Sequence, residues 1–517
     1  MKSSRLLRIA SGAAIVLGAV FAWRCSAGPK GKNLVIIALD TLRPDHLGCY
    51  GYSRATSPNI DAWAQDAVVF ENAQSCAPWT APSLLSLMTS LYPDVHGVTS
   101  FPDPGRMNDR VTTLAEVLKS HGYSTAAFTD GGYAKPQFGL KQGFDIYPLN
   151  RGDLLDEHAS NLDHPDRIRG NVERTLEWLD EVEGEPFFLF FHTYQVHGPY
   201  AAPEECVKLF RPSWDEGVEH AQLEAAVTRW NELRELDQAG AMLINEHNEH
   251  CGFAQRFQLE NDGLGARFQE LAITGTDPRK LEFMRDHYDA EIRYTDHELQ
   301  RVLDWLDRPG VRENTVVVFV SDHGEAFGEH GSIGHGNALH DEALRVLLML
   351  RAPLVAPRRV KDVVRSIDVM PTVLELLDVP RDGLPMQGRS VADLLHGRLL
   401  ASEPSFSHAL SKHGREGRLR AVRDGRWRYV WDTEIGGGLL FDLEIDPAEL
   451  ADISSANADI VERMQGLLRA QSEIDASFRA RASGPVAEYV IDDDTRRELE
   501  QLGYTEGKAS SRRTKRE

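Results

Sequence analysis

The stretch NLVIIALDT, residues 33–41, decides the fold that the rest of the chain builds around. Asn33 to Leu39 is dominated by β-branched and other apolar side chains. Such a run predicts a strand that is buried on both faces, as at the centre of a parallel sheet. Asp40 and Thr41 follow directly, at the carboxyl end of this strand. Open α/β sheets bind their ligands at that edge, so we expect both residues to border a binding site.

Similar apolar runs alternate with amphipathic segments along the chain. The predicted strands cover residues 68–70, 124–128, 187–191, 315–320 and 344–350, and the predicted helices cover 57–67, 112–122, 169–181, 288–306 and 368–377. This alternation predicts an α/β fold with a largely parallel central sheet and helices on both faces. Past residue 400 the pattern changes to short alternating strands (418–431 and 438–443) and a helix (460–472), which predicts a smaller C-terminal α+β subdomain.

The predicted organisation has five parts. Residues 1–28 place basic side chains before an apolar run, Ile9 to Trp23, which is typical of a secretory signal peptide. An uncleaved membrane anchor is the alternative, and either one predicts an extracytoplasmic protein. We expect a catalytic domain over 33–400, with a polar helical insertion over 201–285 that covers one face. The C-terminal subdomain spans 401–480, and a tail over 481–517 is expected to be largely disordered at its end.

The composition narrows the classes of partner. With 57 basic and 79 acidic side chains, the net charge of −22 argues against a nucleic-acid-binding protein. Five cysteines are too few for a disulfide framework in a chain of 517 residues. Cys206 and Cys251 flank one helical region and are the candidates for a single pair, which the sequence leaves open.

A second informative stretch is CAPWTAPSLLSLMTS, residues 76–90. Pro78 and Pro82 disfavour helical conformation in the residues before them, so we expect a helix that begins only at Ser83, with Ser83 as its cap. Apolar residues at positions 84, 87, 88 and 91 follow the spacing of one helix face. Thr80 then lies in a turn ahead of a helix N-terminus, where backbone N–H groups favour an anion.

Polar residues of several segments converge at the predicted sheet edge. Asp40 follows one strand, His197 follows another, and Asp322-His323 follows a third, while Thr80 precedes a helix. We expect Asp40, Thr80, Asp322 and His323 to bind one divalent ion, with Mn²⁺, Mg²⁺, Ca²⁺ and Zn²⁺ all compatible. A metal would activate the Thr80 hydroxyl as a nucleophile. His197 and His335 remain to bind the substrate anion or to protonate a leaving group.

Several segments resemble the sulfatase family of the alkaline phosphatase superfamily. LVIIALDTLRPDHLGCYGY and SPNIDAWAQDAVVFENAQS resemble its opening, and VSDHGEAFGEHGSIGHG resembles its second metal-binding segment. IDVMPTVLELLDVP, AVRDGRWRYVW and GLLFDLEIDPAEL resemble later landmarks, so the similarity runs from about residue 33 to 450. The resemblance implies metal ligation by Asp40, Asp322 and His323, with residue 80 as the nucleophile.

The chain departs from the family pattern in three ways. Sulfatases carry a Cys or Ser that becomes formylglycine, and alignment on the downstream threonine places Thr80 there, with Leu84 at the family's arginine. The alternative alignment places Cys76 at the formylglycine position, but Leu85 then occupies the position of the family's downstream threonine. The family's paired aspartates appear as Asp40-Thr41, which loses one ligand. The Gly-Lys-Trp-His segment appears as residues 129–132, TDGG, which removes a cationic contact to sulfate.

The remaining ligand set resembles the single-metal site of superfamily members that form a phosphothreonine, such as glycerol-phosphate transferases. We therefore expect a metal-dependent enzyme that hydrolyses or transfers sulfate or phosphate esters, with Thr80 as nucleophile. Thr41, His197 and His335 are the predicted substrate-binding residues, and the substrate is a small-molecule, glycan or lipid anionic ester. One alternative is an arylsulfatase-type hydrolase that uses Thr80 or Cys76. The other is a catalytically inactive, sulfatase-shaped protein that binds anionic glycans.

Overall fold

The computed structural model describes most of the predicted catalytic domain and the C-terminal subdomain. The described residues are 32–99, 104–148, 167–213, 278–336, 338–409, 419–433, 436–482 and, nearer the C-terminus, 491, 492, 495, 496, 498, 499 and 502. The predicted signal peptide or anchor, Cys251 and most of the predicted 201–285 insertion lie outside the described residues. Among the described helices, none combines the length and apolar character that a membrane span requires.

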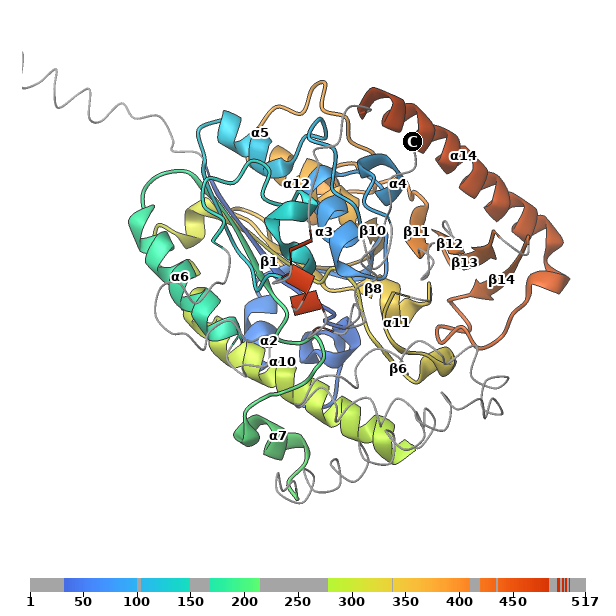
Figure 1. The fold of residues 1–517 in the computed structure, drawn as a ribbon, viewed down its shortest axis with the longest axis horizontal. Helices are drawn as coiled ribbons and strands as arrows, with labels where there is room; N and C mark the ends of the chain where they lie inside the picture. Colours follow the sequence, from blue (N-terminus) through green and yellow to red (C-terminus); the bar gives the residue numbers. More distant parts are fainter. Residues whose placement is uncertain are drawn as a thin grey trace, which may run out of the picture.

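A large mixed sheet forms the centre of the molecule (Figure 1). Its strand order is β10-β2-β9-β5-β1-β4-β3, and β8 pairs with β2 as an eighth strand. The strands are β1 (Asn33–Leu39), β2 (Val68–Gln74), β3 (Ser124–Phe128), β4 (Phe187–Thr193), β5 (Thr315–Val320), β8 (Arg345–Val346), β9 (Leu348–Arg351) and β10 (Arg358–Arg365). The neighbours β5, β1, β4 and β3 run parallel, whereas β9 is antiparallel to both β5 and β2. The predicted largely parallel sheet is confirmed, with β10 as a strand that the sequence analysis missed.

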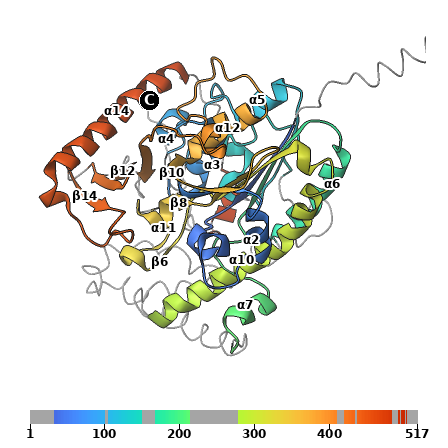
Figure 2. The same ribbon diagram turned by 180° about the vertical axis from the view of Figure 1, so that it is seen from behind.

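Both faces of β1 are buried, as its sequence predicts. Leu34, Ile36 and Ala38 pack into one apolar cluster, and the intervening side chains pack into another. The first face is covered by α3 (Thr80–Thr89), α5 (Leu114–Ser120) and α12 (Val369–Leu376). The second is covered by α2 (Pro58–Ala64), α6 (Arg167–Glu181) and α10 (Pro278–Leu306). Figures 1 and 2 show these two helical layers on opposite sides of the sheet, which confirms the prediction of helices on both faces.

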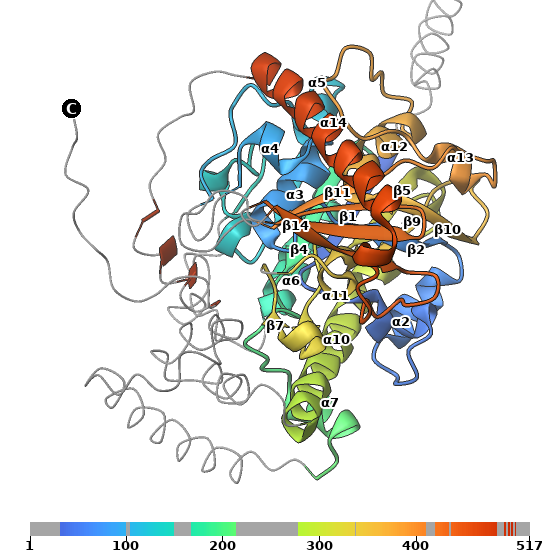
Figure 3. The same cartoon turned by 90° about the vertical axis from the view of Figure 1, so that its right-hand side faces the viewer.

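The chain after residue 400 forms the smaller subdomain (Figure 3). It contains a four-stranded antiparallel sheet, in the order β11-β12-β13-β14, and one long helix. These elements are β11 (Ser405–Ala409), β12 (Leu419–Asp424), β13 (Trp427–Asp432), β14 (Gly437–Asp442) and α14 (Ala458–Ala482). Met464 and Leu468 of α14 pack with Val422 and Tyr429 of the sheet. The predicted α+β subdomain is confirmed, although α14 is longer than the predicted helix.

The start of α3 differs from the sequence prediction. The helix begins at Thr80, with Trp79 as the residue that precedes it, rather than at Ser83. Pro82 is its third residue, and the N–H groups of a first helical turn have no intrahelical partner, so proline is tolerated there. The Ser83 hydroxyl donates to the Ala77 carbonyl at 2.8 Å and does not cap the helix. Consequently Thr80 is itself the first residue of the helix.

Candidate active site

The polar residues that follow β1, β4 and β5 meet at one edge of the sheet. Ala38 of β1 lies opposite His192 of β4 and Val320 of β5, so the three parallel strands end side by side. Asp40, one residue past β1, donates its backbone N–H to the Thr193 carbonyl at 3.1 Å. Asp322 and His323 lie just beyond β5. The expected convergence of strand ends therefore places the candidate metal ligands together.

Thr80, the first residue of α3, lies next to these strand-end residues. Its side chain is buried, and its Oγ1 donates to Asp40 Oδ2 at 3.2 Å. The same oxygen lies 3.3 Å from His323 Nε2. Asp40, Thr80 and His323 thus make one contact group, contributed by a strand end, a helix start and the segment after a second strand.

The two carboxylates of the site are incompletely paired. Asp322 Oδ1 accepts the backbone N–H groups of Thr41 and His323, at 3.2 Å and 2.9 Å. Asp322 Oδ2 and Asp40 Oδ1 are buried and accept no hydrogen bond from any described residue. Burial, together with the nearby Asp322 carboxylate, raises the pKa of Asp40 well above its usual value. Two buried carboxylates, each with an oxygen whose lone pairs accept no hydrogen bond, provide a suitable environment for a cation.

His323 is oriented as a metal ligand would be. Its Nδ1 lies 3.0 Å from the Gly324 carbonyl, which can only accept, so the proton resides on Nδ1. Its Nε2 therefore presents a lone pair toward Asp40, Thr80 and Asp322, and lies 3.4 Å from Asp322 Oδ2. A second-sphere carbonyl that fixes the tautomer in this way is the usual support of a metal-binding histidine.

His192 is a further candidate ligand that the sequence analysis did not assign. Its Nε2 lies 3.3 Å from Asp40 Oδ2, and burial lowers its pKa, which favours the neutral ring. Ligand atoms of Asp40, His192 and Asp322 all lie within 4.8 Å of one another. The signal was present in the sequence, because His192 is the penultimate residue of a strand that ends at the ligand edge.

His197 and His335 border the ligand group. The His335 ring centroid lies 4.5 Å from that of His323 and 4.9 Å from that of His197. His335 Nδ1 is 3.1 Å from Glu325 Oε2, and burial raises the pKa of Glu325 to about 8. The structure thus brings together all the predicted ligands and both predicted substrate-binding histidines.

Thr41 contributes its backbone to the site. It adopts a left-handed conformation with φ of 56°, which is unusual for a β-branched residue. Its side-chain hydroxyl donates to the Asp40 carbonyl at 2.7 Å, while its N–H donates to Asp322. The turn after β1 is therefore shaped so that Asp40 and Asp322 face one another, and the predicted substrate contact of Thr41 stays a prediction.

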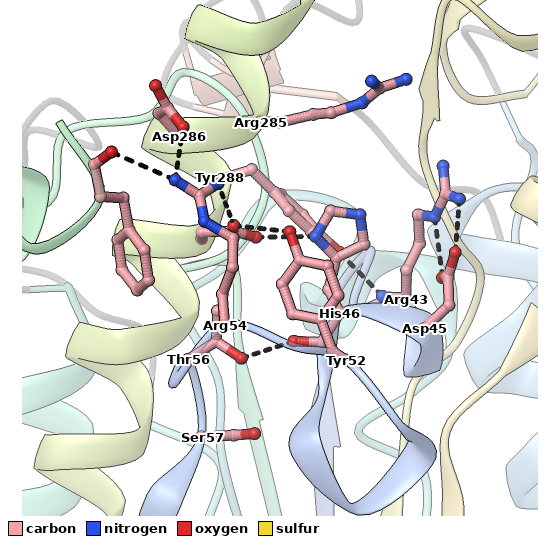
Figure 4. A network of polar contacts seen from close by, with 12 residues as sticks. Arg43, Asp45, His46, Tyr52, Arg54, Thr56, Ser57, Arg285, Asp286 and Tyr288 are labelled. Carbon is pink, nitrogen blue, oxygen red and sulfur yellow. Dashed lines mark hydrogen bonds and ion pairs between the residues drawn. The ribbon is translucent and has the colours of Figure 1, made fainter.

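Residues of α10 contact this turn and the segment that follows it, and Figure 4 shows the contacts of that segment from Arg43 onward. The Tyr288 hydroxyl donates to the Thr41 carbonyl at 2.9 Å and accepts the Arg43 N–H at 2.8 Å. Farther along, Asp289 of α10 accepts from Tyr52 and Arg54, at 2.7 Å and 2.6 Å. Two consecutive residues of α10, Tyr288 and Asp289, thus contact both ends of the segment from Thr41 to Arg54, which directly follows Asp40.

Comparison with known proteins identifies the family. The family model described as Sulfatase matches residues 32–379, and the one described as N-sulphoglucosamine sulphohydrolase, C-terminal, matches residues 328–473. The chain belongs to the sulfatase family. The resemblance seen in the sequence motifs is confirmed, and the class of reaction is the hydrolysis of sulfuric or phosphoric esters.

Individual relatives of this sulfatase-family chain fall into two groups by name. Choline-sulfatase of Rhizobium meliloti (strain 1021) is 26% identical over 465 residues, which are 82% of each chain. The multifunctional alkaline phosphatase superfamily protein PehA of Trinickia caryophylli is 26% identical over 501 residues, 82% of this chain and 91% of that one. The solved phosphonate monoester hydrolase of Agrobacterium radiobacter superposes with a TM-score of 0.62 at 22% identity, covering 87% of this chain and 96% of that one.

The structure shows where the residues of the two alternative registers lie. Leu84 of α3, which the Thr80 register aligns with the family's arginine, is buried in the apolar cluster that α3 shares with the central sheet. Cys76 packs with Tyr92 and Ile367 in a different apolar cluster, and its Sγ lies 3.4 Å from Ser366 Oγ. The residue in contact with Asp40 and His323 is Thr80, and the register that aligns Thr80 with the formylglycine position stays a prediction.

Proposed function

We propose that this sulfatase-family protein cleaves or transfers sulfate or phosphate esters through a covalent ester on Thr80, at a site that holds one divalent cation. The observation that carries the proposal is the position of Thr80 Oγ1. It lies 3.2 Å from Asp40 Oδ2 and 3.3 Å from His323 Nε2, at the start of a helix.

The chain's donor set fits a divalent ion. Asp40, Asp322, His323 and Thr80 would hold it, and His192 is close enough to join or to orient Asp40. Oxygen and imidazole donors suit Mn²⁺, Zn²⁺ or Mg²⁺, and Ca²⁺ where oxygen ligands prevail. When bound, the ion would lower the pKa of the Thr80 hydroxyl and neutralise charge that develops on the transferred group.

The chain's own residues account for the proton movements of the first step. Thr80 Oγ1 forms a bond to the phosphorus or sulfur centre while the bond from that centre to the alcohol oxygen breaks. The Thr80 proton passes along the existing hydrogen bond to Asp40 Oδ2. The His335 ring lies beside His323, and the His197 ring lies 4.9 Å from that of His335, so either of these two rings, when protonated, could supply the proton that the leaving alcohol needs.

The second step distinguishes threonine from formylglycine. A formylglycine hydrate expels sulfate by collapse to its aldehyde, and threonine lacks that route. The Thr80 ester is therefore broken by attack of water or an acceptor alcohol at phosphorus or sulfur, which returns Oγ1 with one proton. Phosphoryl centres accept such a second displacement, so we expect phosphate esters to turn over faster than sulfate esters of the same leaving group.

The decisive experiment is a quenched reaction with a slow ester, followed by digestion and mass spectrometry of the peptide that holds Thr80. We expect phosphate on Thr80. Thr80→Ala should lower kcat by several orders of magnitude, since the nucleophile is lost, while bound metal is retained. Thr89→Ala is the matched control, because Thr89 lies on the same helix and its hydroxyl donates to the Leu85 carbonyl.

Two outcomes would contradict the proposal. Full activity of Thr80→Ala would remove Thr80 from the mechanism. Wild-type protein that binds metal but turns over neither sulfate, phosphate nor phosphonate esters would favour an inactive, glycan-binding sulfatase fold instead.

A further inference from the structure

The described residues near the C-terminus pack beside the candidate active site, away from the long helix α14 that precedes them. Figures 1 and 3 show their short red pieces apart from α14. Glu498 Oε1 pairs with Lys135 Nζ at 2.6 Å, and Glu498 Oε2 accepts the Gly132 N–H at 3.3 Å. Thr495 Oγ1 accepts from Lys135 Nζ at 3.1 Å and from Gln137 Nε2 at 2.7 Å. We call Lys135 Nζ together with the Gly132 N–H the cradle.

The C-terminal segment that carries Glu498 is held beside the cradle by apolar packing as well as by the ion pair. Leu499 and Leu502 are buried in the same apolar cluster as Trp79 and Tyr133. Gly132 has φ of 56°, and a Cβ there would lie 2.7 Å from Leu502 Cδ1 and 2.9 Å from the Tyr194 ring. The backbone of the turn is therefore pressed between the C-terminal segment and Tyr194, at a position that only glycine fits.

Tyr194 connects the cradle to the nucleophile. Its hydroxyl accepts the Tyr133 N–H at 3.0 Å and hydrogen-bonds the Thr80 side chain. Its ring lies edge-on to His192 and His197, with centroids 4.9 Å and 5.3 Å away. One tyrosine thus separates the cradle from the group that we propose binds and cleaves the ester.

The cradle requires an anion. The Lys135 side chain is only 8% exposed, and a buried ammonium without a counterion is strongly unfavourable. A cation and a backbone N–H bind carboxylate, sulfate and phosphate oxygens alike, because all of these are charged acceptors. Glu498 meets this requirement from within the chain, which makes its carboxylate a competitor of any anionic group that arrives with a substrate.

We propose that Lys135 and the Gly132 N–H form a second anion-binding position, which Glu498 fills until a substrate with a second anionic group displaces it. The proposal rests on the proposed function for the identity of the adjoining site. It predicts selectivity for esters that carry a carboxylate, sulfate or phosphate besides the group that is cleaved. Glu498 would then be the residue that sets this selectivity.

The test uses full-length protein carrying Thr80→Ala, so that no turnover interferes, and follows amide hydrogen exchange of the peptide that contains Thr495 and Glu498. Inorganic phosphate at high concentration is the probe, with sodium chloride at equal ionic strength as the reference. We expect phosphate to speed exchange of this peptide about five-fold relative to chloride, because losing an ion pair of ordinary strength changes a local opening equilibrium by about that factor. Lys135→Met should abolish the difference between the two salts.

A second variant makes the result independent of phosphate. Glu498→Gln should exchange about five-fold faster without any added phosphate, whereas Glu473→Gln, an exposed position on α14, should match the parent. Equal exchange in phosphate and chloride would overturn the second anion position, and unchanged exchange in Glu498→Gln would overturn its occupation by Glu498. Because the parent already lacks the Thr80 hydroxyl, either outcome leaves the proposed nucleophile unaffected, and a failure of the nucleophile leaves this test unaffected.

Discussion

At the scale of single residues, the repulsion between two buried carboxylates dominates the site. Asp40 and Asp322 are both almost fully buried, and each has one oxygen that accepts no hydrogen bond from the described residues. Without a cation, this arrangement destabilises the folded protein, and with one it becomes a source of affinity. The same pair should therefore affect stability in opposite directions in the metal-free and the metal-bound protein.

Asp322→Asn tests this balance. We expect it to lose most bound divalent metal, because one of two charged ligands is removed. The metal-free variant should unfold at a higher temperature than metal-free wild type, since the like-charge repulsion is relieved. Metal content by plasma mass spectrometry and thermal unfolding with and without a chelator measure both effects. Wild-type metal stoichiometry in the variant would exclude Asp322 as a ligand.

Cys76 provides the complementary prediction at this scale. The thiol is buried beside Ser366, and burial raises its pKa, so it is poorly suited to act as a nucleophile. Cys76→Ala should keep most activity and lose about 1 kcal/mol of stability from the small cavity. The intact mass of wild-type protein should show an unmodified thiol. An aldehyde at residue 76 would instead restore a formylglycine mechanism in the other register.

At the scale of elements, the geometry of the site depends on the hydrogen bonds between α10 and the turn after β1. The Tyr288 hydroxyl bridges the Thr41 carbonyl and the Arg43 N–H, and Thr41 in turn donates to Asp322. The left-handed conformation of Thr41 costs free energy that such contacts must offset. Tyr288 touches none of the ligand side chains in these contacts, so we regard it as a positioning residue.

Tyr288→Phe should separate positioning from general stability. The change removes one hydroxyl and leaves two backbone groups without a partner, at a cost of about 1–3 kcal/mol. We expect kcat to fall about ten-fold with little change in KM, and metal affinity to weaken. Tyr50→Phe is the matched control, because its hydroxyl donates to the Phe70 and Leu348 carbonyls, in the sheet. Equal loss of kcat in both variants would show that Tyr288 acts only on stability.

The sequence predicted those elements whose position follows from the strand pattern. Asp40, Asp322 and His323 were expected to meet because parallel strands place their carboxyl ends together, and the structure agrees. The start of α3 was predicted three residues late, because proline was read as a helix breaker rather than as a first-turn residue. Tyr288 had no local signal at all, since its role arises only from how α10 packs on the turn.

At the scale of the whole molecule, His330 links the catalytic part to the C-terminal subdomain. Its Nδ1 lies 2.8 Å from Glu342 Oε1, and its Nε2 lies 3.1 Å and 3.2 Å from the carbonyl oxygens of Ala448 and Glu449. All three partners are acceptors when Glu342 is ionised, so both ring nitrogens donate and the ring is protonated. The ring stacks on His340 at 3.8 Å, with an interplanar angle of 9°. Lone pairs in two parallel planes do not converge on one ion, which favours a structural link over a metal site.

His330→Gln should weaken this link in a pH-dependent way. The hydrogen bond to Glu342 raises the pKa of His330 from 6.5 to about 9. A pKa that is higher in the folded state adds stability that is complete below about pH 6.5 and disappears as the pH rises through 9. Because His330 is partly open to solvent, we expect only about 1 kcal/mol, or a Tm lower by about 1–2 °C at pH 6. At pH 10 the Tm values of variant and wild type should coincide, and the exposed His121→Gln should change neither. A Tm difference that persists undiminished at pH 10 would show that shape, not charge, joins the two parts at His330.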